Sequence, residues 1–242
     1  MPTVIATLPH ECGQVEVLIH RQSKRITLRL DHASRNAQLV LPHKRFLGQG
    51  KKLLLQRSNW LSQQWKKLPV SMPFTAGGTI MLGGEQTQLE FKLGRGAARE
   101  QNGKFIVPAT QEAAFADRVR RALIERARVQ LHEQVDIYAK CLNVQPQKIT
   151  VRDTRSRWGS CSAAGNLNFS WRLICAPAFV LSYVAAHEVA HLREANHSFK
   201  FWDLVKQSFG DPAPARKYLR ANAPELFAIG AEEQTNLQWR ES

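Results

Sequence analysis

Two histidines and a glutamate stand at a spacing that suits metal-dependent hydrolysis. His187, Glu188 and His191 form the pattern H-E-x-x-H inside an apolar segment. Residues four apart on an α-helix differ by about 40° around the axis and about 6 Å along it, so both imidazoles can converge on one ion. Glu188 is turned by about 100° from His187, which lets its carboxylate reach a water molecule at the metal without binding the metal itself. The pattern predicts two zinc ligands and a general base.

A catalytic zinc ion needs a third protein ligand and one open position. His197 is the preferred candidate, although six residues beyond His191 is the wrong side of a continuing helix. We therefore expect the chain to turn near Asn196, a residue type that tolerates the left-handed conformation that ends many helices. A new helix, capped by Ser198, is then expected to follow. The competing ligand is Glu194, which shares the helical face of the two histidines but lies a further turn along the axis. The apolar stripe of the new helix is expected to consist of Phe199, Trp202, Val205 and Phe209.

The alternative is that the motif arose by chance, or that its histidines are buried and hydrogen-bonded in a core. Chance would also have to supply a predicted helix, an apolar segment leading into it and a third histidine after a helix-ending residue. The metal site is therefore the favoured interpretation.

Cationic side chains precede the predicted metal helix. Arg155 and Arg157 lie in a loop between two predicted strands, and Arg172 lies on the second strand. They are candidate substrate-binding residues, because guanidinium groups stabilise negative charge that develops during hydrolysis. A plain turn joining two strands is the alternative for the loop. Tyr183, one turn before His187, can reach the site or pack in the core.

Apolar periodicity predicts an α+β fold in two parts. Residues 1–110 alternate as short strands, with one helix expected over Gly48–Leu68, and form a β-rich subdomain. Residues 111–242 begin with a long amphipathic helix from Glu112 to Leu142 and form the domain that carries the metal site. Two strands, around 149–151 and 167–173, are expected between the long helix and the metal helix.

Composition indicates an ordinary globular protein with a strong positive charge. Lys and Arg number 34 against 20 Asp and Glu, giving a net charge of +14 among 242 residues. This charge attracts polyanions such as nucleic acid, or it only keeps the surface solvated. The four cysteines form no C-x-x-C pair, which favours free thiols in a reducing compartment. No secretory leader or apolar run of membrane length is visible, so a cytoplasmic location without a membrane span is expected.

The segment from Val151 to Trp202 resembles the YgjP-like metal-dependent hydrolase family, which is related to the WLM and SprT-type zincins. The resemblance is carried by RWGSCS and NHSxxFW around H-E-x-x-H, and by HRQSKRITLRL and SNWLSQQWKKLP nearer the amino terminus. It implies a zincin-like metallopeptidase domain behind a small amino-terminal sheet and helix. By position it implies zinc held by His187, His191 and His197, with Glu188 catalytic.

Three functions follow from these observations. The first is a zinc metallopeptidase acting on extended polypeptide. The second keeps the metal but hydrolyses nucleoside triphosphates, whose phosphates the arginines would bind. The third is a nucleic-acid-binding module with a structural metal, which requires four ligands where the sequence supplies three. Imidazole ligands also accept manganese, cobalt or nickel, so other divalent metals stay open.

Overall fold

The computed structural model describes residues 3–31, 36–154 and 157–231. The residues before Ser71 form one compact unit together with Ala231, and residues 71–230 form the second. Both units mix helices and strands, which confirms the expected α+β class. The division expected at residue 110 falls inside the second unit, because the strands just before it share one hydrophobic core with the long helix that follows.

The first unit is a four-stranded sheet with two helices. Its strand order is β1-β2-β4-β3, with β2 and β4 parallel and the other pairs antiparallel. The strands are β1 (Thr3–His10), β2 (Gly13–Ile19), β3 (Thr27–Asp31) and β4 (Asn36–Leu41). A short 3-10 helix η1 (Lys44–Phe46) leads into α1 (Leu47–Gln56) and α2 (Ser58–Lys66). The single helix expected here is broken at Arg57, whose backbone leaves the helical conformation (φ −106°, ψ 11°). Leu54 and Leu61 still reach the same core as the sheet.

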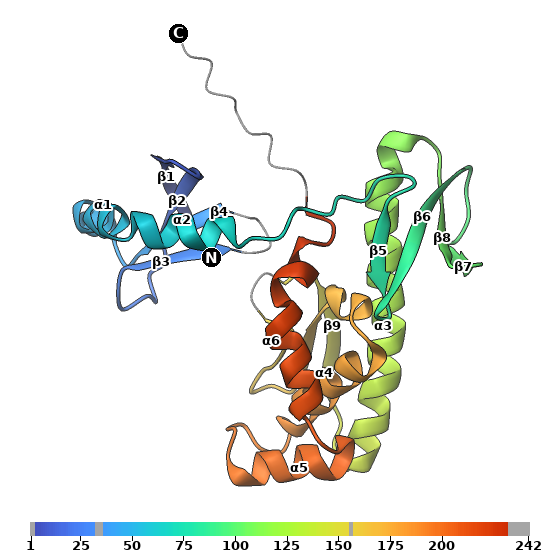
Figure 1. Ribbon diagram of the computed structural model, residues 1–242. Coiled ribbons are helices and arrows are strands. Elements are labelled where there is room, and N and C mark those ends of the chain that lie inside the picture. Colours follow the sequence, from blue (N-terminus) through green and yellow to red (C-terminus); the bar gives the residue numbers. More distant parts are fainter. Residues whose placement is uncertain (1–2, 32–35, 155–156, 232–242) are drawn as a thin grey trace. The chain divides into compact units, whose positions relative to one another are not determined.

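The second unit begins with another sheet that packs against its longest helix. The strand order is β5-β6-β8-β7, formed by β5 (Thr79–Leu82), β6 (Glu85–Leu93), β7 (Arg99–Gln101) and β8 (Lys104–Ala109). After the 3-10 helix η2 (Glu112–Ala114), α3 (Phe115–Cys141) runs beside this sheet and beside β9 and α4 (Figure 1). The helix confirms the expected one, since its buried residues recur every three or four positions: Phe115, Val119, Leu123, Ala127, Leu131, Val135 and Tyr138.

A three-stranded sheet follows, in the order β10-β11-β9. Its strands are β9 (Lys148–Arg152), β10 (Gly159–Cys161) and β11 (Asn166–Ser170), with β10 antiparallel and β9 parallel to the central β11. The strand expected over 167–173 is wrong in its second half, because Trp171–Cys175 forms the 3-10 helix η3. All five residues of η3 are buried, so the apolar run there reflects burial on every side rather than strand alternation.

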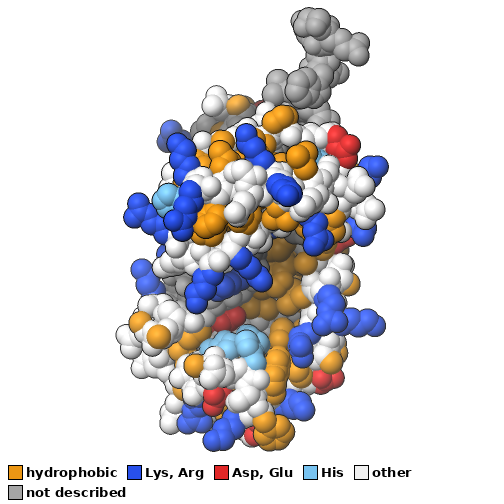
Figure 2. Space-filling model, turned by 90° about the vertical axis from the view of Figure 1, so that its left-hand side faces the viewer, with side chains coloured by type: hydrophobic (Ala, Val, Ile, Leu, Met, Phe, Trp, Pro, Cys, Tyr) orange, Lys and Arg blue, Asp and Glu red, His pale blue; other side chains and the backbone are white. Residues whose placement is uncertain are grey.

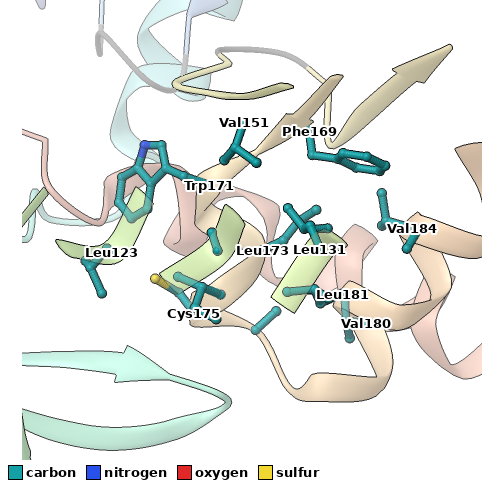
Figure 3. Close-up of a cluster of buried hydrophobic side chains, with 14 of the residues drawn as sticks. Leu123, Leu131, Val151, Phe169, Trp171, Leu173, Cys175, Val180, Leu181 and Val184 are labelled. Atoms are coloured by element: carbon teal, nitrogen blue, oxygen red, sulfur yellow. The ribbon is translucent and has the colours of Figure 1, made fainter. Parts of the chain in front are cut away.

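The last three helices are α4 (Ala178–Ala190), α5 (Phe199–Phe209) and α6 (Ala213–Ala228). The central one is α4, which packs against α3, α5, α6 and β10 and has nine buried residues out of 13. This explains why its sequence is apolar almost all round. Figure 3 shows part of the core that α4 forms with its neighbours, in which Val180, Leu181 and Val184 of α4 lie among Leu123, Leu131, Phe169, Trp171 and Leu173. Within the described ranges no helix, α4 included, has the length and apolar character needed to cross a bilayer.

Candidate metal centre

The end of α4 places two imidazoles side by side. His187 lies in the last turn of the helix, and His191 is the first residue after it, still with helical dihedrals (φ −65°, ψ −18°). Their ring centroids are 5.0 Å apart. The four-residue spacing therefore brings the two imidazoles close together, as predicted. The neighbouring helices hold this segment in the core.

The third imidazole comes from the loop that follows. The N–H groups of Leu192 and Arg193 bond to the carbonyls three residues before them, which tightens the chain after α4. The left-handed turn expected at Asn196 is absent, since the non-glycine residues with positive φ in the described ranges are Asn102 and Asn143. The helix ends earlier than expected, and the loop returns His197 to the end of α4. There its Nε2 atom lies 3.0 Å from Nε2 of His187.

The three imidazoles fit a divalent metal ion. One ring nitrogen from each of His187, His191 and His197 lies within 4.8 Å of the others, and no other group of this kind occurs among the residues that the structure describes. A tetrahedral zinc with Zn–N bonds of about 2.0–2.1 Å separates its nitrogens by about 3.3 Å, which this cluster can meet. Neither the carboxylate of Glu194 nor the thiol of Cys161 belongs to it.

The other nitrogens of the two helix-end imidazoles have partners. Nδ1 of His187 lies 3.3 Å from the hydroxyl of Tyr183, and Nδ1 of His191 lies 3.0 Å from the backbone oxygen of Glu194. Such contacts orient a histidine ring and leave Nε2 for the metal. Tyr183 thus packs in the core and also contacts a proposed metal ligand, so it does both of the things that its position had suggested.

Burial keeps these groups in the protonation states that suit a cation. It lowers the pKa of His187 to about 3, an effect that the nearby His191, His197 and Arg216 reinforce. Burial also lowers the pKa of His191. It raises the pKa of Tyr183 to about 12. At neutral pH the two imidazoles are therefore uncharged, which is the metal-binding form, and the phenol keeps its proton.

A buried aromatic ring lies against all three imidazoles. The Phe201 centroid is 4.8 Å from that of His187, 4.4 Å from His191 and 4.7 Å from His197. The prediction that Phe199 belongs to the buried stripe of this helix is wrong. Phe199 is 84% exposed, whereas Phe201 is fully buried. Spacing alone could not show which face of α5 meets the histidines. The expected cap is confirmed, since the side chain of Ser198 accepts a hydrogen bond from the N–H of Phe201.

The carboxylate of Glu188 is buried beside β10. The residue is 5% exposed, and burial raises its pKa to about 7, while the charge of Arg157 acts in the opposite direction. A Cβ atom added to Gly159 would lie 2.5 Å from Oε1 of Glu188. Any larger residue here would therefore displace the Glu188 side chain, a role of Gly159 that the RWGSCS motif did not by itself reveal. A carboxylate with a pKa near neutrality can take up and release a proton during catalysis.

The three arginines expected to bind substrate differ in their surroundings. Arg157 is exposed and its charge acts on Glu188, whereas Arg155 lies outside the described residues. Arg172 is only 2% exposed, pairs with Asp153, and lies 4.6 Å from the Trp171 ring centroid. Its expected role in substrate binding is not supported, because its guanidinium is enclosed in the core.

A further arginine, which no sequence motif marked, lies near the imidazoles. Arg216 of α6 is exposed, stands 4.7 Å above the ring centroid of Trp202, and contributes to the low pKa of His187. It was missed because α6 carries no recognisable motif, and only the packing of α6 against α4 brings it here.

The site is open to solvent on one side. Figure 2 shows histidine side chains gathered at the surface, with a strip of hydrophobic side chains beside them. His197 is exposed, while Glu188 lies deeper. The fold thus brings three imidazoles and a buried carboxylate together close to the surface. These are the groups that metal-dependent hydrolysis requires.

Comparison with known protein families agrees with this class. Residues 24–222 match the model of the YgjP-like, metallopeptidase domain. The chain belongs to this family and is a metal-dependent hydrolase, which confirms the resemblance seen in its motifs. The family implies a divalent metal, for which the three histidines are available.

Two other comparisons add little. No curated protein matches the chain. Among solved structures, the chain is similar to the metallopeptidase zymogen of Pyrococcus abyssi abylysin, with 20% identity and a TM-score of 0.32 over 40% of this chain and 94% of that one. A likeness at this level carries no conclusion about the present site.

Proposed function

We propose that the chain is a zinc metallopeptidase in which His187, His191 and His197 bind the metal and Glu188 is the general base. The observation that carries the proposal is the convergence of three imidazole nitrogens within 4.8 Å next to a buried carboxylate. Three protein ligands leave a position for water or substrate, as hydrolytic zinc sites require. Membership of a metallopeptidase family supports peptide as the substrate class.

The residues of the site divide the chemistry among them. When bound, zinc polarises the scissile carbonyl and acidifies the attacking water. Glu188 accepts the proton of that water and passes it to the leaving amine. Arg157 is exposed near Glu188 and offers positive charge to the oxyanion that develops at the carbonyl.

An extended substrate has a strand to pair with. In its sheet, β10 lies at the edge, and it packs against α4 through Gly159 and Glu188. Extended peptides add to such edges through backbone hydrogen bonds. The neighbouring strand β11 is the central one of this sheet, so both of its edges are already paired. We therefore assign substrate alignment to β10.

The two alternatives receive less support. Nucleotide hydrolysis depended on clustered arginines, yet Arg172 is buried and paired with Asp153. A structural metal would need a fourth ligand, and the cluster in the described residues has three.

We also propose a cytoplasmic location, since a reducing compartment preserves the free thiols of Cys12, Cys141, Cys161 and Cys175.

Zinc-loaded protein should be incubated in parallel with casein and with nucleoside triphosphates. We expect peptide products, and a loss of about 10²–10⁴-fold in rate for Glu188→Gln, the range typical of a general base. The matched control is zinc content, which Glu188→Gln should retain because Glu188 is not a ligand. Nucleotide products without peptide products, or full activity of Glu188→Gln, would contradict the proposal.

A further inference from the structure

The three proposed ligands are not supported equally. His187 and His191 each have a partner at Nδ1, the Tyr183 hydroxyl and the Glu194 backbone oxygen. The corresponding nitrogen of His197 has no hydrogen bond within the part of the chain that the structure describes. His197 is also exposed and comes from a loop. Something other than a hydrogen bond must therefore hold its ring.

The start of α5 supplies that support through a known helix-start contact. Ser198 is the N-cap, so His197 precedes the cap and Trp202 is the fourth residue of the helix. Side chains at these two positions commonly pack together and fix the direction in which the chain enters the helix. Here the indole of Trp202 stacks on the imidazole of His197, with centroids 5.8 Å apart and an interplanar angle of 28°.

A second element holds the indole. Arg216 of α6 places its guanidinium 4.7 Å from the Trp202 ring centroid. No carboxylate pairs with Arg216 among the described residues, so this contact with Trp202 is its principal one. Tryptophan is the aromatic side chain that attracts cations most strongly, and arginine is the cation found over aromatic rings most often. The contact restricts rotation of the indole.

We infer that Trp202, held by Arg216, is the positioning residue for His197 and so sets the metal affinity of the site. This inference rests on the proposed metal centre and extends it. The contact takes the place of the hydrogen bond that orients each of the other two imidazoles. Losing the indole removes the stacking partner of the His197 ring and leaves only the edge contact with Phe201, so the third ligand becomes less well ordered than the other two.

The test is the zinc affinity of full-length variants, measured by competition with a chelator. For Trp202→Ala we expect zinc to bind about 10–100-fold more weakly, the usual cost of losing an outer contact to a ligand. For Arg216→Ala we expect a smaller loss, about twofold, because an exposed cation–π pair is worth about twofold to fivefold and the removal of a positive charge near His187 partly offsets it. Trp202→Phe should recover most of the affinity, because it restores an aromatic face.

Matched controls lie on the same helices. Phe199→Ala removes an exposed aromatic residue of α5, and Arg220→Ala removes an exposed arginine of α6, one turn from Arg216. Both should bind zinc like the wild type. Circular dichroism of the metal-free proteins shows whether each variant is folded. If Trp202→Ala is not, Arg216→Ala decides the question, because its altered side chain is exposed.

The absorption spectrum of the cobalt-substituted protein separates positioning from general stability. We expect Trp202→Ala to change the cobalt d–d bands, because an imidazole leaves the coordination shell, and the controls to keep the wild-type spectrum. Wild-type zinc affinity and spectrum in both Trp202→Ala and Arg216→Ala would overturn the inference and leave the metal centre intact. Failure of the wild type itself to bind zinc would instead overturn the proposed metal centre.

Discussion

His187 and His191 come from one helix, whereas His197 comes from the loop after it. The first two are separated by one helical turn, and α4 is buried between other helices, so backbone geometry sets their distance. The third depends on where the loop ends and how α5 begins, which tertiary contacts decide. The comparison teaches that local helical spacing places two of the three ligands, whereas only the folded chain places the third.

The largest expected effect comes from removing either kind of ligand. We expect His187→Ala and His197→Ala each to weaken zinc binding by more than about 100-fold, beyond the range seen for outer contacts. Metal content after dialysis against a weak chelator measures this. If His187 and His191 alone sufficed to bind zinc, His197→Ala would keep its zinc. That result would contradict the need for a third ligand from the loop.

The control for this prediction is Glu194→Gln. Glu194 contributes its backbone oxygen to His191, and that oxygen stays in place when the side chain changes. We therefore expect wild-type zinc affinity. A large loss in Glu194→Gln would instead show that its carboxylate is the third ligand.

The next prediction concerns the contact between β10 and α4. A methyl group at Gly159 would meet the carboxylate of Glu188, so Gly159→Ala must shift the general base. Misplacement by about 1 Å can cost about 100-fold in rate, and we expect a fall in kcat of that order. Zinc affinity should not change. Ser160→Ala on the same strand is the matched control, and equal activity of both variants would contradict the steric role of Gly159.

A third prediction follows from the burial of Glu188 on the helix. Its pKa is raised from the ordinary 4.5 to about 7, so the folded metal-free protein holds a proton that the unfolded chain releases between these values. The contribution of Glu188 to the free energy of unfolding must therefore decrease as the pH rises through that window. Glu188→Gln removes this dependence.

We expect metal-free Glu188→Gln to be more stable than the wild type by about 2–3 kcal/mol at pH 8, and close to it at pH 4. Denaturant unfolding at the two pH values measures the difference. The prediction is contradicted if the free energy of unfolding of the wild type, relative to that of the variant, does not fall between pH 4 and pH 8. Burial of the Glu188 carboxylate would then not destabilise the metal-free protein.

The smallest expected effect is that of the tyrosine hydroxyl. Tyr183→Phe keeps the ring packed against His187 and removes the contact to its Nδ1 atom. We expect zinc affinity to fall by about tenfold, at the low end for an outer partner. Tyr138→Phe is the matched control, because it also removes a buried hydroxyl contact, to Ser182, away from the imidazoles. Equal affinities would mean that helical geometry alone orients His187.

The sequence was informative where spacing alone decides structure. The long helix α3, the histidine pair at the end of α4 and the cap at Ser198 all follow from periodicity or from local hydrogen bonding. These features need only neighbours in the chain, so one sequence suffices to predict them.

The remaining features depend on which elements meet. The alternation of 167–173 does not reveal that the second half is enclosed as η3. It also cannot show that the buried Arg172 pairs with Asp153. The contact of Arg216 with Trp202 joins α6 to α5 across the fold. No spacing rule relates such residues, because their distance is set by packing between helices.

The central claim is tested most directly by X-ray absorption at the zinc edge of the zinc-loaded full-length protein. We predict one zinc per chain, with three imidazole nitrogens at about 2.0–2.1 Å and one oxygen donor that is not from the protein. His197→Ala should lose one of these imidazole contributions. A sulfur donor, a fourth protein ligand, or an unchanged spectrum in His197→Ala would contradict the account.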